Sequence, residues 1–187
     1  MDSRAKILHG IQTGQMLFRS TNACARFYPV EDGQRVAKVF INMSPREEAE
    51  REYRNLQALQ TLDARIRVPA PYEILEIGSR QPLMAQGLEA YGVGEDAIYA
   101  VVMEWIHGPS IKQLPPQGRP AYRPALHALL DALQDHHLFF TDLKRDHLLC
   151  MDTSAAVCLV DTHMMKTAPV KPDEYAWLRH YLDQDSP

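Results

Sequence analysis

The segment from His136 to Met165, HHLFFTDLKRDHLLCMDTSAAVCLVDTHMM, constrains the fold more than any other part of the chain. Its two short apolar runs, LLCM and AVCLV, are separated by the turn signal Asp-Thr-Ser, and this pattern predicts a β-hairpin. Asp142 precedes the hairpin and Asp161 follows it. Because the two open ends of a hairpin lie side by side, both carboxylates are expected at one end of a small sheet.

Lys144 and His147 lie between the first aspartate and the hairpin. One carboxylate in such a group can orient or deprotonate a hydroxyl, and the other can hold Mg²⁺ on the phosphates of a nucleotide. The alternative is a pair of surface loops with ordinary solvated carboxylates. The hairpin alone does not distinguish these two interpretations, so the other motifs of the chain have to.

Residues 15–41 show a strand pattern, with apolar runs separated by the hairpin turn Glu31-Asp32-Gly33. In the last run, Lys38 shares its side of the strand with Val36 and Phe40. A lysine on an apolar face is costly to bury without a partner. The alternative is that the Lys38 side chain extends to the surface.

A helix is predicted to begin at the capping box Ser44-Pro45-Arg46-Glu47 and to continue to Leu62. Glu52 lies on the same side of this helix as Leu56, four residues later, and therefore points inward. We predict that Glu52 pairs with Lys38. Three other acidic residues near the helix start compete for this role: Glu47, Glu48 and Glu50. We interpret them as a solvated face that suits the helix N-terminus.

The nearly continuous apolar run of residues 98–106, IYAVVMEWI, predicts a buried strand, followed by a bend at His107-Gly108-Pro109-Ser110. Residues 79–96 and 114–124 are predicted to be loops. An amphipathic helix is expected over residues 121–138, with its leucines on one face, and a last helix over residues 172–184.

Five of these motifs, in this order, resemble the eukaryotic-like protein kinase superfamily. VAKVF resembles the strand with the conserved lysine, EYRNLQAL the helix with its glutamate, and VVMEWIHG the interlobe hinge; TDLKRDH and VDTH resemble the catalytic loop and the metal-binding motif. The resemblance covers residues 15–165. It implies an α+β, protein-kinase-like two-lobed fold, with an N-lobe of residues 1–106 and a truncated, minimal C-lobe of residues 107–187.

The resemblance implies ATP with Mg²⁺ or Mn²⁺ as cofactors, and a catalytic role for three residues. Lys38 is expected on the α- and β-phosphates, Asp142 as base or hydroxyl orienter, and Lys144 on the γ-phosphate. Other matching positions are implied to bind the nucleotide or metal: Glu52 by positioning Lys38, Met103 as gatekeeper, the backbones of Glu104 and Ile106 at the adenine edge, the turn residues Ser20, Thr21 and Asn22 at phosphate, and Asp161 with His147 at the metal.

The chain departs from the protein kinase pattern at several positions. The turn between the first two strands has no glycine, and Thr141 replaces the arginine that meets a phosphorylated activation loop. His147 stands in place of an asparagine, and Asp161-Thr162-His163 in place of Asp-Phe-Gly. The last two features resemble the lipopolysaccharide-core kinases. The short C-terminal half resembles minimal kinases that bacteria secrete into host cells.

Lys144, two residues after Asp142, is typical of protein Ser/Thr kinases and favours a protein hydroxyl as the acceptor. A bacterial effector kinase acting on a host protein is one form of this hypothesis. His147 and the Asp-Thr-His motif favour instead a kinase of lipopolysaccharide, sugars or small molecules. The missing glycines and His147 favour a third alternative, a pseudokinase that serves as a binding module.

The composition excludes several classes of protein. A net charge of −4 gives no general reason to expect nucleic acid as a partner. No apolar run reaches the length of a membrane span, and the N-terminal residues lack the apolar core of a signal peptide. The three cysteines have no metal-binding spacing. We expect a cytoplasmic protein, or one secreted into a host cell without a cleaved signal peptide.

Overall fold

The computed structural model describes residues 2–19, 25–31, 33–41, 44–79, 97–151, 154–171 and 173–183. The chain forms two compact units: the first contains Met1–Arg54 and Ala70–Trp105, and the second contains Asn55–Pro69 and Ile106–Pro187. The chain therefore crosses between the units three times. The predicted lobes, residues 1–106 and 107–187, would be joined by a single crossing. The turn residues Asp32, Asp152 and Thr153 and the loop of residues 80–96 lie outside the described residues.

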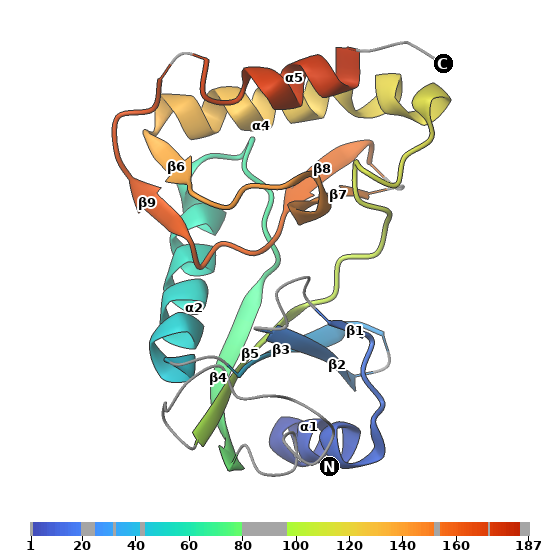
Figure 1. Cartoon of the computed structure of the whole chain (residues 1–187), viewed down its shortest axis with the longest axis vertical. Coiled ribbons are helices and arrows are strands. Elements are labelled where there is room, and N and C mark those ends of the chain that lie inside the picture. Colours follow the sequence, from blue (N-terminus) through green and yellow to red (C-terminus); the bar gives the residue numbers. More distant parts are fainter. Residues whose placement is uncertain are drawn as a thin grey trace. The chain divides into compact units, whose positions relative to one another are not determined.

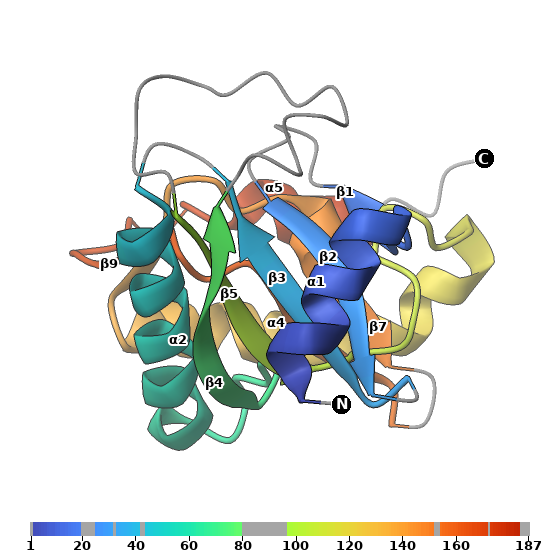
Figure 2. The same cartoon turned by 90° about the horizontal axis from the view of Figure 1, so that it is seen from below.

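A five-stranded antiparallel sheet forms the centre of the first unit (Figure 2). In sheet order its strands are β1 (Phe18–Arg19), β2 (Ala25–Glu31), β3 (Arg35–Phe40), β5 (Ala97–Glu104) and β4 (Pro71–Ser79). The apolar runs at residues 15–41 and 98–106 thus form the predicted strands. Strand β5 is largely buried, as its continuous apolar sequence predicts.

Helix α1 (Ser3–Thr13) lies across one face of this sheet (Figure 2) and is absent from the elements predicted from the sequence. Ile7 and Ile11, one turn apart, are buried in one core with β2, β3, β4 and β5 residues, including Tyr28. Local signals for the helix do exist. The Asp2 side chain accepts a hydrogen bond from the Ala5 N–H, and Gly14 ends the helix with a φ of 71°.

Helix α2 (Pro45–Leu62) begins and ends where the capping box and the leucine spacing predict. The N–H of Glu48 donates to the Ser44 carbonyl at 3.1 Å, which places the first turn directly after Ser44. The first unit includes α2 as far as Arg54, and the second unit includes the rest of the helix.

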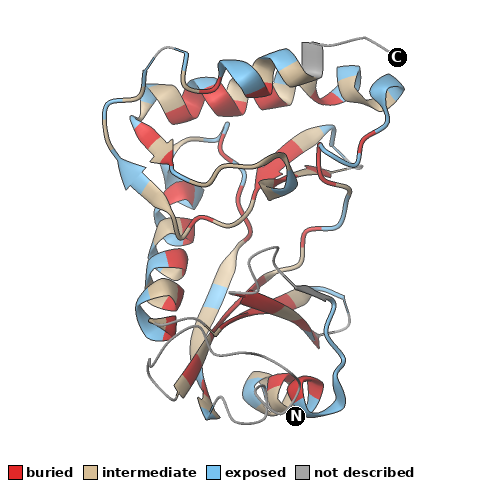
Figure 3. Cartoon of the chain, in the orientation of Figure 1, coloured by how far each residue is buried: buried red, intermediate tan, exposed pale blue. Residues whose placement is uncertain are grey.

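The second unit is built around helices α4 (Arg123–Asp135) and α5 (Ala176–Asp183), which lie alongside each other (Figure 1). The predicted leucine face of α4 is buried (Figure 3). The prediction of a loop over residues 114–124 was wrong in part, because Pro116–Tyr122 forms the 3-10 helix η1. Proline at the start and again within this segment disfavours an α-helix but is compatible with a short, tighter helix.

Two short strand pairs complete the second unit. Strand β7 (Leu148–Met151) pairs with β8 (Ala156–Leu159), which confirms the predicted hairpin, and β6 (Leu138–Phe140) pairs with β9 (Met165–Thr167). The Tyr175 hydroxyl donates to the Leu138 carbonyl at 2.6 Å, and burial raises the pKa of Tyr175 to about 12. This bond attaches the segment before α5 to β6, which leads to Asp142.

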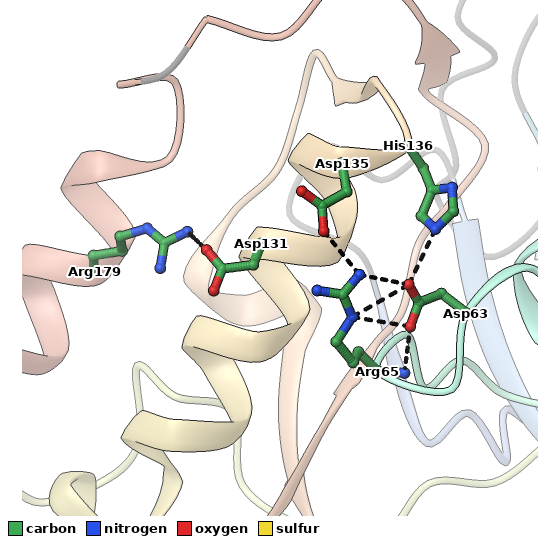
Figure 4. A network of polar contacts seen from close by, with 6 residues as sticks. All are labelled: Asp63, Arg65, Asp131, Asp135, His136 and Arg179. Carbon is green, nitrogen blue, oxygen red and sulfur yellow. Dashed lines mark hydrogen bonds and ion pairs between the residues drawn. The ribbon is translucent and has the colours of Figure 1, made fainter.

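A polar network connects the turn after α2 to the end of α4 (Figure 4). The Arg65 guanidinium lies 2.7 Å from an Asp63 oxygen and 2.8 Å from an Asp135 oxygen. His136 Nε2 lies 3.0 Å from Asp63. Hydrogen bonds from Arg65 hold the pKa of the Asp63 carboxyl well below its usual range.

The low pKa predicts how Asp63 contributes to stability as pH changes. Because its folded-state pKa is depressed, the ionised carboxylate stabilises the fold at pH values above about 4, and this contribution is lost as pH falls further. The Asp63→Asn variant should therefore have a lower free energy of unfolding than wild type at pH 7, and this difference should become smaller below about pH 4. Chemical unfolding over a pH series measures the difference, and Asp173→Asn, at an exposed position, is the control. A difference that stays constant at low pH would contradict this prediction.

Gly108 lies against strand β7 where no other residue fits. Its φ is 145°, and a Cβ atom at this position would lie 1.9 Å from the Cys150 carbonyl oxygen. The close approach is held by backbone hydrogen bonds on both sides: Cys150 N–H donates to Pro109 at 2.8 Å, and Ile111 N–H donates to Leu148 at 2.9 Å. The bend predicted after β5 thus places its glycine directly on β7.

Gly108→Ala should lower the free energy of unfolding by about 2 kcal/mol or more, because both the backbone conformation and the contact with Cys150 become unfavourable. Gly118→Ala is the matched control. A Cβ there would lie 3.7 Å from the nearest atom, on Pro115, so its effect should stay within about 1 kcal/mol. Urea unfolding compares the two variants, and equal stabilities would show that the Gly108 contact is unimportant.

No helix in the described ranges is long and apolar enough to cross a membrane.

Candidate active site

Lys38 and Glu52 form a buried ion pair within the first unit. Lys38 Nζ lies 3.3 Å from Glu52 Oε2, and the two side chains are 3% and 0% exposed. The Lys38 ammonium also lies 5.0 Å from the centroid of the Phe40 ring, on the side of β3 that the strand pattern predicts. The predicted pairing is therefore present, and the alternative of a lysine extended to solvent is wrong. Glu50, one of the competing acids, pairs with Arg46 instead.

A buried ion pair contributes little net stability, because desolvation of both charges offsets their attraction, but removing one partner is costly. Lys38→Met or Glu52→Gln alone should lower the free energy of unfolding by about 3–5 kcal/mol. The double variant should lose less than the sum, because the two losses are coupled. The exposed pair Arg46 and Glu50 on the same helix, 2.9 Å apart, is the control, with coupling below about 0.5 kcal/mol. Additive losses at Lys38 and Glu52 would contradict the pairing.

The three residues predicted to bind adenine have different surroundings. Met103 is buried in β5, opposite Val36 of β3. The Glu104 N–H donates to the Ala70 carbonyl at 2.8 Å, and its side chain accepts from the Ala70 N–H at 3.1 Å. The Ile106 N–H has no hydrogen-bond partner among the described residues. That the backbones of Glu104 and Ile106 bind the adenine edge stays a prediction.

Ser20, Thr21 and Asn22, the predicted phosphate-contacting turn, lie outside the described residues.

Asp142 and Lys144 form an ion pair in the loop after β6. Lys144 Nζ lies 2.8 Å from the Asp142 carboxylate, and both side chains are 39% exposed. The Lys144 carbonyl accepts a hydrogen bond from the His147 N–H at 3.0 Å, which closes the short helix η2 (Arg145–His147).

Asp161 contacts the imidazole groups of His147 and His163 within the second unit. His163 Nδ1 lies 2.5 Å from Asp161 Oδ1, and His147 Nε2 lies 3.5 Å from Asp161 Oδ2. The three side chains are between 15% and 21% exposed, so this group is largely desolvated. The sequence motif includes His163, but its contact with Asp161 was not predicted. The signal for it is the i, i+2 spacing across a tight turn.

The backbone around Asp161 is fixed from both sides. Asp161 has a φ of 67°, an unfavourable value for a residue other than glycine. The preceding N–H, from Val160, donates to the His147 carbonyl at 2.8 Å. The following carbonyl, of Thr162, accepts from the Asn55 side chain at 2.6 Å. Such an over-determined, strained conformation is typical of functional sites.

Asp161 and His163 offer a carboxylate oxygen and an imidazole nitrogen within 4.8 Å of each other, which are donor types that divalent metal ions use. Carboxylate oxygen suits Mg²⁺ and Mn²⁺, and neutral imidazole suits transition metals better than Mg²⁺. Asp142 belongs to a separate group, since its contacts in the described part of the chain are with Lys144. The hairpin thus brings His147 close to Asp161. In the loop before the hairpin, Asp142 pairs with Lys144.

The strand lysine with its helix glutamate, the buried hinge strand and the two aspartate motifs define a protein-kinase-like phosphotransferase. Residues 22–185 match the Phosphotransferase enzyme family (APH), and the chain belongs to this family. The family implies ATP use, typically with a divalent metal. No curated protein sequence matches the chain.

The solved structure of the bifunctional kinase-methyltransferase WbdD is similar to this fold, with a TM-score of 0.53 and 14% sequence identity. The match covers 88% of this chain and 35% of WbdD, so the chain spans about a third of that protein's length. At this identity the likeness shows the fold alone. It confirms the α+β, protein-kinase-like fold that the sequence predicts.

Proposed function

We propose that the protein transfers the γ-phosphate of ATP to a Ser or Thr hydroxyl of a protein acceptor. The observation that carries this proposal is the ion pair of Lys144 with Asp142, 2.8 Å long, in the loop that precedes the β7–β8 hairpin. The ammonium of Lys144 supplies positive charge next to the carboxylate that would orient the hydroxyl.

The predicted catalytic and metal-binding residues each have a role in this reaction. Asp142 accepts the hydroxyl proton as the new oxygen–phosphorus bond forms and the bond from the γ-phosphorus to ADP breaks. Lys144 balances charge on the transferred group, and Lys38, positioned by Glu52, balances it on the α- and β-phosphates. Asp161 and His147 would hold the metal ion, whose chemistry is to neutralise phosphate charge. Residues 1–106 would serve mainly for nucleotide binding and residues 107–187 for catalysis.

A second acceptor class is favoured by a specific observation. Both imidazoles of the Asp161 group occur at positions where the sequence resembles lipopolysaccharide-core kinases. A sugar, lipopolysaccharide or small-molecule hydroxyl is therefore the alternative acceptor. The role of a secreted effector that modifies a host protein stays a prediction from the sequence resemblance.

Phosphate transfer from γ-labelled ATP, with Mg²⁺ or Mn²⁺, tests the proposal. The acceptors are a cell lysate, the protein itself and a set of sugars. Label on discrete lysate proteins is expected with wild type. Asp142→Asn should slow the transfer by about 10²–10⁴-fold, because the proton acceptor is lost. Asp161→Ala should slow it by at least about 10²-fold, because charge neutralisation is lost.

Asp146→Asn is the matched control, since Asp146 lies in the same loop but pairs with Lys112 at 2.9 Å. This variant should retain the transfer activity. Label on sugars only would move the acceptor to the alternative class. Wild type that is as inactive as Asp161→Ala, together with no shift of the melting temperature by any nucleotide and metal, would leave the pseudokinase as the remaining interpretation.

A further inference from the structure

Two arginine side chains stack on the ring of Tyr181, which belongs to α5. The Arg119 and Arg145 guanidinium carbons both lie 4.4 Å from the ring centroid, and Arg119 also donates to the Tyr181 hydroxyl at 3.1 Å. Arg119 belongs to η1 and Arg145 to η2, so three separate elements meet at this ring. We call Arg119, Arg145 and Tyr181 the arginine clamp.

The clamp holds two positive charges that no carboxylate of the described residues neutralises. Two other arginines of the second unit do have such partners: Arg65 pairs with Asp63 and Asp135, and Arg179 with Asp131 (Figure 4). Stacking on an aromatic ring compensates a guanidinium only in part. Moreover, the Arg119 Nε is buried and has no hydrogen-bond partner in the described part of the chain. Donors of this kind suit a carboxylate or phosphate ligand.

The clamp is close in sequence to the proposed catalytic aspartate. Arg145 follows Asp142 by three residues, and three residues span at most about 10 Å. The neighbouring lysines are already engaged, Lys144 by Asp142 and Lys112 by Asp146. Arg145 and Arg119, by contrast, have no carboxylate partner among the described residues and are available to an anionic ligand.

We propose that the arginine clamp binds an acidic side chain beside the phosphorylated hydroxyl, so that the enzyme selects Ser or Thr within acidic peptide segments. This inference rests on the proposed function, because it names the substrate class of the same reaction. The planar guanidinium groups match the geometry of a carboxylate, and the ring holds them in place before binding. Trp177, 46% exposed and one turn before Tyr181, adds an apolar surface on the same side of α5.

Peptides with one serine and identical lengths test this proposal. They carry Asp, Asn or Lys at the flanking positions, and a fourth carries phosphoserine there. Wild type should show a KM for the Asp peptide about tenfold or more below that for the Asn peptide, with a similar kcat. Arg119→Ala and Arg145→Ala should each remove most of this difference and leave the KM for ATP unchanged. The phosphoserine peptide distinguishes a preference for carboxylate from one for phosphate.

Two variants separate anion binding from mere packing of α5. Tyr181→Phe retains the ring and should retain the preference for acidic peptides. Arg179→Ala removes a different arginine from the same helix and should also retain it. Melting temperatures show whether each variant is folded. Equal KM values for the Asp and Asn peptides, or a preference that survives in the double Arg119→Ala, Arg145→Ala variant, would overturn the proposal.

Direct binding of the same peptides to Asp161→Ala by calorimetry separates this proposal from the proposed function. Binding of the Asp peptide that is lost with both arginines, but without phosphate transfer by wild type, would support the clamp and refute the kinase reaction on peptides. Transfer without charge preference would refute the clamp alone. Neither binding nor transfer would refute both.

Discussion

The buried ion pair of Lys38 and Glu52 is the interaction on which the first unit depends. It places a full charge where the sheet and α2 exclude water, and a charge in that position must be paired. Because the pair joins the middle of β3 to α2, it sets the rotation of the helix about its axis as well as its position along the strand. The same pairing defines the orientation of the Lys38 side chain. Because removal of one partner would leave an unpaired buried charge, the packing of β3 against α2 depends on both residues.

In the second unit, the loop between β6 and β7 contains Asp142 and has to be held in a defined shape. The loop between β6 and β7 has little apolar surface of its own, so contacts at its edges determine its shape. Gly108 permits the chain to lie directly on β7, and Tyr175 attaches β6 to the segment before α5. Asp63 and Arg65 anchor the end of α4 that leads into β6. These contacts lie outside the residues proposed to react, yet they determine where Asp142 and Asp161 are.

Charge is distributed unevenly over this second unit. Asp142 has its own cation, Asp161 has two imidazoles, and the arginine clamp has no carboxylate among the described residues. A phosphotransferase needs positive charge at the phosphates and a carboxylate at the hydroxyl. In the proposed reaction the Asp142 and Asp161 groups would meet this need, and the clamp would add positive charge that the reaction itself does not require. That excess is the physical reason to connect the clamp with the acceptor.

The sequence by itself determined the strands within residues 15–41 and 98–106, α2, the hairpin, the Lys38–Glu52 pair and the family, because each depends on periodicity, on a cap or turn residue, or on a short motif. It did not predict α1, whose short apolar spacing is a weak signal until the sheet offers a face to cover. Only the tertiary structure decided that Arg119 meets Tyr181, 62 residues away. A contact of this kind depends on how distant elements pack against one another, and a local sequence pattern does not predict that packing.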